Sequence, residues 1–583
     1  MLTRLTVSNF KRFGHKVEIE LGNPVVLIGP NDSGKTTALQ ALALWHIGLS
    51  RWTEKRSGKA RPEKRPGVAI NRRDLIAMPV PDARLLWKDL SVRAVERSEK
   101  GQRTQNIRMD ILVEGVSGGK DWACGLEFDY ANEESIYCRP LRQAEGKSRD
   151  RMPIPNEAGD VKIAFLPPMS GLSANETRLD PGAISVRLGE GRTAEVLRNL
   201  CYQVLVGKAG DQKKWDDLRR RIKSLFGITL NEPKYIPERG EIAMTYKDAL
   251  ETELDLSCSG RGMQQVMLLL AYLAGNPNSV LLLDEPDAHL EVLRQRQIYQ
   301  MLTETASSQN SQIIAASHSE VILNEAADRD VVVAFLGKPH RIDDRGSQLL
   351  KALKDIGYEH YFQAEETGWV LYLEGSTDLS ILQTFARILE HPAGKYLEKP
   401  FVHYVENKPN KAYEHYYGLQ EAKSDLVGYA LFDRLESQVK DDKPGLRQHM
   451  WERREIENYL CDRNVLLRWA ESIAKAEQGE LFSAMWRKSM EKAIEDVESA
   501  MKTLGKESPW SGATKVSDEF LGPVFEKFFK ALKLPNLMSK SNYHKLAKHL
   551  DKSEVAEEIR QVLDEIREVA EKAKPVEGAG ERT

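Results

Sequence analysis

Residues 24–48 read PVVLIGPNDSGKTTALQALALWHIG, and this stretch decides the fold of the N-terminal half. Its first apolar residues predict a buried strand, a glycine-rich turn follows, and the later apolar spacing predicts an amphipathic helix. The turn matches GxxxxGK[ST], in which backbone N–H groups face phosphate oxygens at the start of a helix. A strand before the turn and a helix after it favour a nucleotide site over a surface turn with an exposed lysine.

The residues of this turn predict a site for ATP and Mg²⁺. We expect Lys35 to reach the outer phosphates and the Thr36 hydroxyl to bind Mg²⁺. Residues 280–285, VLLLDE, predict a strand that ends in two acids; Asp284 would lie beside Mg²⁺ and Glu285 would polarise the attacking water. A helix N-cap is the alternative role for Asp284. The expected nucleotide-binding residues of the turn are Gly29, Pro30, Asn31, Asp32, Ser33, Gly34, Lys35, Thr36 and Thr37.

Two further segments narrow the class of ATPase. Residues 256–264, LSCSGRGMQ, open a predicted helix just before the Asp284 strand and resemble the ABC signature. The resemblance implies that this helix start binds the γ-phosphate of ATP held by another subunit. His318, in IIAASHS, occupies the place of the switch histidine, and residues 285–290 resemble the dimer-contacting loop. The signature residues are Ser259, Gly260, Gly262 and Gln264.

The order of these motifs resembles an ABC ATPase of the RecF-like and structural-maintenance-of-chromosomes branch, to which residues 7–13, VSNFKRF, are also similar. That resemblance implies a head-to-tail homodimer, or a higher even-numbered oligomer, closed around ATP. The segment from Thr193 to Phe226 is polar and helical and is interpreted as part of an arm inserted into the ATPase.

A second unit is expected from about residue 365. WVLYLEG, FVHYVE and LVGYALFD are three apolar segments separated by helical stretches, which predicts a small parallel sheet. Two of them end in acids, Glu374 and Asp433, and Asp378 follows Glu374 at a helix start. This pattern resembles a Toprim domain, in which the glutamate works at a metal site. Where that family has DxD, this chain has Asp433 and then Leu435, with Glu436 as a substitute.

Residues further along the chain add to the resemblance to a Toprim domain. Residues 455–459, EIENY, resemble a segment of Toprim-like nucleases, and Glu455 and Glu457 share a face if the chain is extended. Lys540, with Lys545 as the alternative, falls where these nucleases carry a late catalytic lysine; a solvated helix face is the other interpretation. The residues expected to act in phosphodiester hydrolysis, with metal ligands first, are Glu374, Asp433, Glu457, Asp378, Glu455 and Lys540.

The length and composition of the chain limit the possible number of domains and the class of protein. The chain has 583 residues, 41% of them hydrophobic, which predicts at least two domains. A net charge of −3 identifies no partner. Five scattered cysteines, no leader and no membrane-length apolar run predict a cytoplasmic protein without contact to a membrane. The basic segment 51–75 is interpreted as a loop, either solvated or in contact with nucleic-acid phosphates.

The expected fold class is α/β: an ABC-type P-loop ATPase at 1–350 with an inserted helical arm at about 175–250, a parallel-sheet Toprim-like domain at 365–470, and a helical region at 471–583. The last ten residues are expected to be disordered. The whole architecture resembles the OLD (overcoming lysogenization defect) family of nucleases. It implies ATP and Mg²⁺ as cofactors, with Mn²⁺ as an alternative at the nuclease site.

The functional hypothesis is that ATP controls an endonuclease that acts on nucleic acid, with DNA favoured over RNA. The resemblance also implies a role in anti-phage defence, and it leaves open a separately encoded defence partner. Two alternatives remain: an ATP-driven scaffold whose degenerate Toprim module acts through a partner protein, as Leu435 suggests, and a RecF-like repair ATPase that clamps DNA without cutting it.

Overall fold

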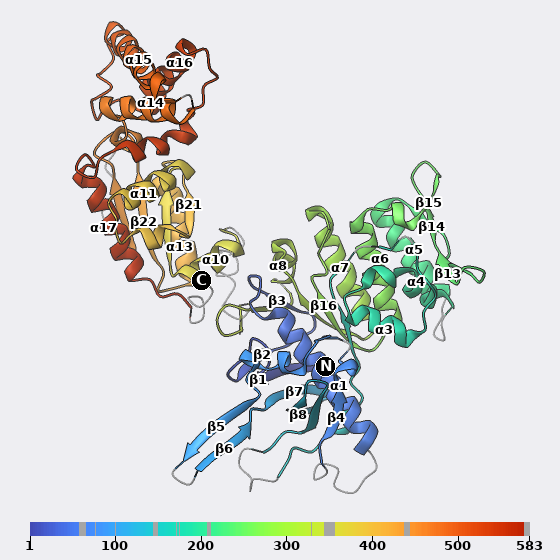
Figure 1. Ribbon diagram of the computed structural model, residues 1–583. Helices are drawn as coiled ribbons and strands as arrows, with labels where there is room; N and C mark the ends of the chain where they lie inside the picture. The colour runs from blue at the N-terminus through green and yellow to red at the C-terminus, as the bar shows by residue number, and fades with distance from the viewer. Residues whose placement is uncertain are drawn as a thin grey trace. The chain divides into compact units, whose positions relative to one another are not determined.

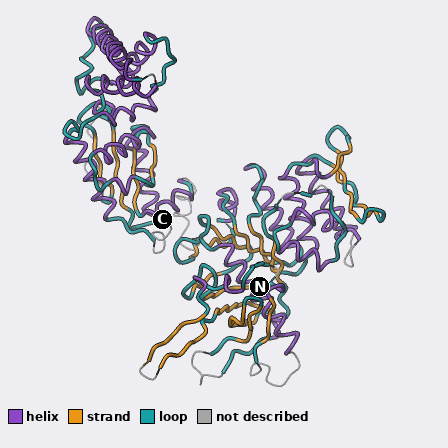
Figure 2. The backbone as a smooth tube through the Cα atoms, viewed as in Figure 1, coloured by secondary structure: helices purple, strands orange, loops and turns teal. Residues whose placement is uncertain are grey.

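The computed structural model describes residues 1–56, 66–75, 77–98, 101–143, 150–170, 172–173, 175–206, 212–327, 329–342, 356–435, 444–477 and 479–576. The chain divides into two compact units, Met1–Leu350 and Lys351–Thr583. The helices and strands of each are drawn in Figure 1, and Figure 2 shows that both units mix helices with sheets.

Unit 1 has an antiparallel sheet on one side, in the order β2-β1-β7-β8-β9-β4. Side chains alternate between buried and part-exposed along β7, so one face of the strand packs on the core. β7 and β8 pair antiparallel, as the alternating patterns at 106–115 and 122–130 predict. The strands are β1 (Leu2–Ser8), β2 (Val17–Glu20), β4 (Val68–Asn71), β7 (Met109–Ser117), β8 (Lys120–Asn132) and β9 (Ser135–Pro140), with a separate hairpin of β5 (Arg93–Ser98) and β6 (Gly101–Asn106).

The second sheet of unit 1 has the order β10-β16-β17-β3-β18-β19 and is parallel except for β19. Its central strands are fully buried, as expected for a parallel sheet covered on both faces. Helix α1 (Lys35–Arg56) contacts both sheets and buries Leu39, Leu42 and Trp45 between them. The strands are β3 (Val25–Ile28), β10 (Ile163–Leu166), β16 (Val280–Asp284), β17 (Gln312–Ala316), β18 (Val331–Ala334) and β19 (His340–Arg341).

Helices cover the other face of the parallel sheet. The segment expected to be an arm contains α4 and α5, and both pack against α6 around a shared core that includes Trp215 and Leu268 (Figure 1). After α1, the helices described in unit 1 are α3 (Pro181–Gly189), α4 (Leu197–Val206), α5 (Gln212–Phe226), α6 (Arg261–Gly275), α7 (Val292–Ser308) and α8 (Glu320–Ala326), together with the short α2 (Asn156–Gly159), which contacts α1 and β8 instead. Five short strands lie between α5 and α6: β11 (Thr229–Leu230), β12 (Lys234–Ile236), β13 (Glu241–Ala243), β14 (Thr245–Lys247) and β15 (Glu253–Asp255).

The interpretation of 51–75 as a loop is wrong at both ends. Residues 51–56 continue α1, because Trp52 is buried on the same helix face as Leu49. Residues 68–71 form β4, which pairs with β9. Arg51 is held by Glu54 and Asp74, and Arg72 by Glu134, so these two cations are already paired within the chain. Residues 57–65 lie outside the described part of the chain.

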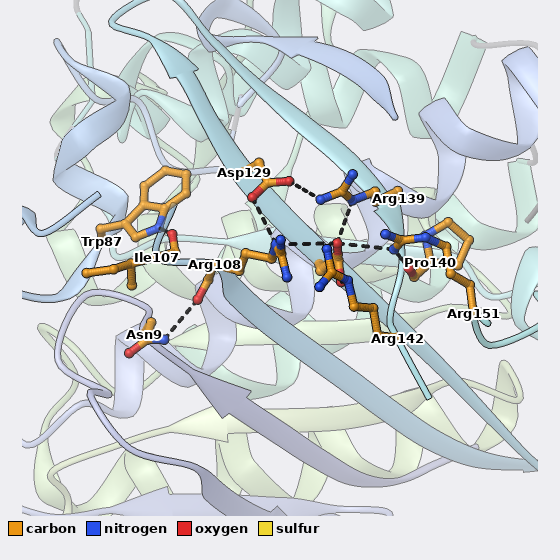
Figure 3. Close-up of polar contacts among 10 residues, drawn as sticks. Asn9, Trp87, Ile107, Arg108, Asp129, Arg139, Pro140, Arg142 and Arg151 are labelled. Atoms are coloured by element: carbon orange, nitrogen blue, oxygen red, sulfur yellow. Dashed lines mark hydrogen bonds and ion pairs between the residues drawn. The ribbon is translucent and has the colours of Figure 1, made fainter. Parts of the chain in front are cut away.

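A charged network lies on β7, β8 and β9 (Figure 3). The Glu127 side chain is only 2% exposed and lies within 4.0 Å of four guanidinium groups. Arg108 and Arg139 also pair with Asp129. A buried carboxylate is stable only when its charge is compensated, so the four arginines hold this part of the sheet together. They are Arg108, Arg139, Arg142 and Arg151.

Unit 2 is built on a four-stranded parallel sheet in the order β21-β20-β22-β23. Three strands correspond to the predicted apolar segments, and β23 is an additional edge strand. Helices α11 and α17 contact one face of the sheet and α10 and α13 the other (Figure 1). The elements are β20 (Trp369–Leu373), β21 (Val402–Tyr404), β22 (Val427–Phe432), β23 (Leu446–Met450), α10 (Tyr358–Thr367), α11 (Ser376–Ile388), α12 (Gly394–Leu397) and α13 (Pro409–Ala422).

The rest of unit 2 is helical. Trp469, Trp486, Phe525 and Phe528 pack edge to face in the core of these helices. The last helix, α17, returns to the sheet and buries Ile559, among other residues, against it. The helices are α14 (Arg463–Glu477), α15 (Ser483–Thr503), α16 (Gly522–Ala531) and α17 (Glu557–Glu571), with a 3-10 segment η11 (Lys540–His549). Of the tail expected to be disordered, residues 577–583 are outside the described ranges.

Candidate functional site

The loop between β3 and α1 has the backbone of a phosphate cradle. Gly29 has φ +149° and Gly34 has φ +107°, values that side chains rarely tolerate. A Cβ on Gly29 would come within 2.8 Å of the Phe335 carbonyl oxygen and 2.9 Å of Ser33 Oγ. The loop therefore requires glycine at this position, and a glycine-rich turn at the start of a helix is suited to bind phosphate through its N–H groups.

Lys35 lies inside this loop. Its ammonium group donates to the carbonyl oxygens of Gly29 and Pro30, both at 2.8 Å. Burial lowers the pKa of Lys35 to about 8, although nearby carboxylates act in the opposite direction. A buried cation of this kind is stabilised by any anion that enters the loop, as phosphate oxygens would.

The other turn residues surround the cradle. Asn31 and Asp32 are exposed at its tip, where Asp32 forms an ion pair with Arg12 at 3.5 Å. Thr37 is buried in the first turn of α1. Ser33 Oγ is buried and, among the described residues, has no hydrogen-bond partner. An unsatisfied hydroxyl inside the loop fits a phosphate ligand, because it provides the partner that the protein does not supply.

Thr36 and Asp284 come together as the sequence predicts. The Thr36 hydroxyl lies 3.0 Å from each carboxylate oxygen of Asp284, which ends β16. Burial raises the pKa of Asp284 to about 6. A hydroxyl and a buried carboxylate at the mouth of a phosphate loop fit Mg²⁺, which takes one or two protein oxygens and otherwise water and phosphate.

Glu285 and His318 lie beside this pair. Nε2 of His318 is 3.3 Å from Glu285 Oε1, and the Glu285 backbone N–H donates to the Ala316 carbonyl at the end of β17. Glu285 has φ +47°, a left-handed conformation that costs energy in a residue other than glycine. Burial, and then the charge of Lys35, lower the pKa of His318, so the imidazole is neutral near pH 7. The arrangement can orient a water molecule for attack.

The signature segment forms a braced turn at the start of α6. Gly260 is the N-cap, and the Gln264 side chain donates to the Ser259 carbonyl at 2.9 Å. A Cβ on Gly262 would lie 3.1 Å from the His289 carbonyl oxygen, so α6 packs closely on the loop at 285–290. The Ser259 hydroxyl donates to the Leu256 carbonyl at 2.6 Å, and within the described ranges neither Ser259 nor Gly260 makes a hydrogen bond with the loop at 29–36.

In unit 2, Glu374 follows β20, Asp433 follows β22 and Glu457 lies in the turn at 456–459, and these predicted ligands are near enough for the charges of Glu374 and Glu457 to act on Asp433. Burial, followed by the hydrogen bond and charge of Glu374, raises the pKa of Asp433 well above its usual range. Burial, followed by the charges of Glu455 and Asp378, raises the pKa of Glu457 to about 8. Carboxylates that hold one another protonated in this way would be ionised by a divalent cation among them.

Asp378 and Glu455, the second choices, are held by the protein itself. Asp378 Oδ2 accepts from the backbone N–H groups of Glu374 and Gly375 and so caps α11. Glu455 accepts from the Ser517 backbone N–H at 2.6 Å and from its hydroxyl at 2.9 Å. Both carboxylates therefore act first as fixed supports of the neighbouring acids.

The condition under which Glu455 and Glu457 would share a face, an extended chain at 455–457, is not met. Residues 456–459 form a 3-10 turn, because the Asn458 side chain accepts from the Glu455 backbone N–H at 3.0 Å and fixes the turn. Glu455 and Glu457 nevertheless act on each other electrostatically, since the charge of Glu455 raises the pKa of Glu457. The two glutamates are brought near each other by this turn and not by the pleat of a strand.

Two lysines lie near these acids. Lys540 is exposed at the start of η11, and its charge lowers the pKa of Glu455 and Glu457 against the effect of burial. Lys515 pairs with Asp518 at 2.7 Å and is influenced by Glu455 and Glu374. No sequence signal distinguished Lys515 from the other lysines of the helical region.

Leu435 stands where the DxD pattern has its second acid. It follows β22, and its backbone N–H donates to Met450 Sδ at 3.3 Å. The substitute Glu436 lies outside the described residues. Asn407, which the sequence did not single out, accepts from the Asp433 backbone N–H at 3.0 Å and positions that residue.

Comparisons with known protein families identify the class of unit 1. Residues 1–46 match a family model described as "AAA ATPase domain", and residues 204–324 match one described as "AAA domain, putative AbiEii toxin, Type IV TA system". The first match contains the phosphate loop, and the second contains the signature, Asp284, Glu285 and His318. Over these two segments, unit 1 is similar to ATPase domains of the AAA type. ATP, usually with Mg²⁺, is the ligand of that class.

Solved structures give weaker likenesses. An SMC head domain from Thermotoga maritima is 14% identical, with a TM-score of 0.31 over 57% of this chain and 94% of that one. An Smc head domain with an extended coiled coil, bound to the C-terminal domain of ScpA derived from Pyrococcus furiosus, is 14% identical, with a TM-score of 0.33 over 58% and 96%. Curated proteins gave no match. In the described part of the chain, no helix has the length and apolar character needed to cross a bilayer.

Proposed function

We propose that the protein is an ATP-dependent, metal-dependent endonuclease whose two chemistries lie in separate units. The observation that supports the proposal is the electrostatic coupling of Glu374, Asp433 and Glu457: Glu374 hydrogen-bonds to Asp433, and the charges of Glu374 and Glu457 raise the pKa of Asp433. Phosphodiester hydrolysis needs metal ions that neutralise the scissile phosphate and generate hydroxide, and grouped carboxylates supply the ligands. Mg²⁺, or Mn²⁺ in its place, fits an all-oxygen set.

In this proposal the residues around the metal have different roles. Glu374, Asp433 and Glu457 hold the ion, while Ser517 and the backbone of α11 fix Glu455 and Asp378 behind them. Lys540 and Lys515 bring positive charge to the same place and stabilise the phosphate and the leaving oxygen.

The proposed role of unit 1 is control. Lys35, Thr36 and Asp284 hold ATP and Mg²⁺, Glu285 orients water, and His318 contacts the γ-phosphate. Ser259 and Gly260 would bind the nucleotide of a second copy, so ATP would close a homodimer or a higher even-numbered oligomer. Closure would then permit or restrain cutting of nucleic acid, with DNA favoured over RNA, in a cytoplasmic anti-phage role that a separately encoded partner could serve.

A cleavage assay tests the nuclease. Supercoiled plasmid is incubated with Mg²⁺ or Mn²⁺, with and without ATP, beside Glu374→Ala, Lys35→Ala and the matched control Glu421→Ala, an exposed glutamate on α13. Glu374→Ala should reduce nicking by at least about 100-fold, since changes even behind a metal ligand cost 10–100-fold. Glu421→Ala should cut normally, and Lys35→Ala shows whether ATP permits or restrains cutting.

One observation favours a second function, a scaffold that binds a partner and does not cut. Leu435 occupies the place of the second acid of DxD, so the oxygen ligands are fewer than in the family that this segment resembles. Intact DNA and RNA in every lane, with ATP hydrolysis still measurable, would reject the nuclease and support this second function. Cutting unchanged by Glu374→Ala would reject the assignment of the site.

A further inference from the structure

Three histidines meet on the face of the unit 2 sheet that α10 and α13 cover. They are His360 on α10, His403 on β21 and His415 on α13, and their ligating atoms all lie within 4.8 Å of one another. Among the described residues, this is the one group of three or more histidines, cysteines or acids that is so compact. The elements that carry them are labelled in Figure 1.

The cluster is part of the interior and not a chance contact of surface rings. His415 is 7% exposed, and its Nδ1 lies 2.9 Å from the hydroxyl of fully buried Tyr372. Its Nε2 lies 2.9 Å from His360 Nδ1. The His403 and His415 rings are stacked at 3.8 Å with an interplanar angle of 5°.

Burial disfavours the charged form of two of the rings, His403 and His415. Burial, with a smaller effect of His360, lowers the pKa of His403 to about 4. Burial, followed by the charges of His403 and His360, lowers the pKa of His415 to about 2. A neutral imidazole has a free lone pair, which is the form that binds a metal.

The Tyr372 hydroxyl can accept a hydrogen bond from His415 and so support the tautomer that binds a metal. If His415 Nδ1–H donates to the Tyr372 hydroxyl, the lone pair of Nε2 faces His360. Metal-binding histidines almost always have such a partner on the second nitrogen, which fixes the ring and its tautomer. A stack held by packing alone would not need a buried hydroxyl in this position.

Metal binding requires one small shift and one ring rotation. Two nitrogens bound to one tetrahedral Zn²⁺ at about 2.0–2.1 Å lie about 3.3 Å apart. The His360–His415 pair, now at 2.9 Å, must open by about 0.4 Å to reach that separation. His403 must rotate out of the stack, because the lone pairs of parallel rings cannot point at one ion.

We propose that His360, His403 and His415 bind one transition-metal ion, with Zn²⁺ favoured and water in the fourth position. An all-imidazole set suits Zn²⁺, Cu²⁺ or Ni²⁺, whereas Mg²⁺ and Mn²⁺ prefer oxygen. The site would tie α10 and α13 to β21, the edge strand of the sheet. It is separate from the carboxylates at the strand ends and does not depend on nuclease activity.

Cobalt spectroscopy of the full chain tests the site. Chelator-treated protein is titrated with Co²⁺, whose visible absorption is intense in tetrahedral nitrogen sites and weak in octahedral oxygen sites. One equivalent should give the intense spectrum, and Zn²⁺ should displace it. Glu374→Ala should leave the spectrum unchanged, which separates this ion from one at the carboxylates.

The decisive variant is His403→Phe, which keeps a stacked ring and removes both nitrogens. It should reduce Co²⁺ affinity by at least about 100-fold, while the surface control His15→Ala should bind as wild type does. Zn²⁺ should also raise the melting temperature of wild type and not of His403→Phe. A weak octahedral spectrum, or an intense one that His403→Phe leaves intact, would overturn the proposal.

Discussion

His449 on β23 joins the sheet of unit 2 to its last helix, and we expect its replacement to loosen that junction in a pH-dependent way. Nε2 of His449 is 3.1 Å from Glu558 Oε1, and Nδ1 is 3.4 Å from Glu565 Oε2. The three side chains are between 9% and 15% exposed. Tyr429 also donates to Glu565 at 2.8 Å. His449→Gln keeps the size and polarity of the ring but removes its charge.

The magnitude follows from the pKa. Burial alone would lower the pKa of His449, but hydrogen bonds and charges from Glu558 and Glu565 outweigh it and raise the pKa from 6.5 to about 9. A rise of about 2.5 units corresponds to about 3 kcal/mol. Because the folded pKa lies above the unfolded one, this stabilisation is complete below pH 6.5 and is lost as the pH rises through 9.

Urea unfolding at a series of pH values measures the effect. His449→Gln should lower the free energy of unfolding by about 2–3 kcal/mol at pH 6, and the difference from wild type should disappear toward pH 10. His391→Gln is the control, since its partner Asp564 on the same helix is 47% exposed, so the pair should contribute below about 1 kcal/mol. A difference for His449→Gln that stays constant from pH 6 to pH 10 would refute the reasoning.

Three further predictions concern unit 1. Gly29→Ala should abolish binding of a fluorescent ATP analogue while far-UV circular dichroism stays normal, because the Cβ would enter the phosphate cradle; wild-type affinity would contradict the assigned geometry. Glu285→Gln should trap ATP and a dimer in light scattering, and adding Ser259→Arg should return the protein to monomer; a dimer that persists would exclude the signature as the contact. Glu127→Ala should lower the free energy of unfolding by about 3–5 kcal/mol in urea, since it removes the buried carboxylate that compensates four guanidinium charges, and a loss below about 1 kcal/mol would show that water screens the network.

The sequence could predict the ATP site because its parts are local. A strand, a turn and a helix follow one another between residues 24 and 48, and the acids of β16 directly follow its apolar run. Asp284 then meets Thr36 because the carboxyl ends of parallel strands meet at one edge of a sheet. The same reasoning placed Glu374 and Asp433 together in unit 2.

The features that were missed depend on distant parts of the chain. Glu455 is fixed by Ser517, 62 residues later, and no pattern of apolar residues in the sequence predicts that contact. Strand β23, LRQHM, has no apolar run, because it lies at the sheet edge and its polar side chains are matched by acids of α17. The last turn of α1 was not predicted because charged residues surround its one buried tryptophan, Trp52, and the apolar pattern of the helix is lost there.

The two ligand sets of unit 2 differ in chemistry, and this decides how its metal dependence can be measured. Glu374, Asp433 and Glu457 offer oxygen to a hard ion, whereas His403 and His415 offer nitrogen to a softer one. A chelator would remove both ions, so loss of cutting in EDTA cannot identify the metal that performs the chemistry. Restoring Mg²⁺ or Mn²⁺ alone to chelated protein separates them: cutting that returns while the melting temperature stays low assigns catalysis to the carboxylates and stabilisation to the histidines. Cutting that returns only when Zn²⁺ is also present would mean that the carboxylate site depends on the fold that the histidine site holds.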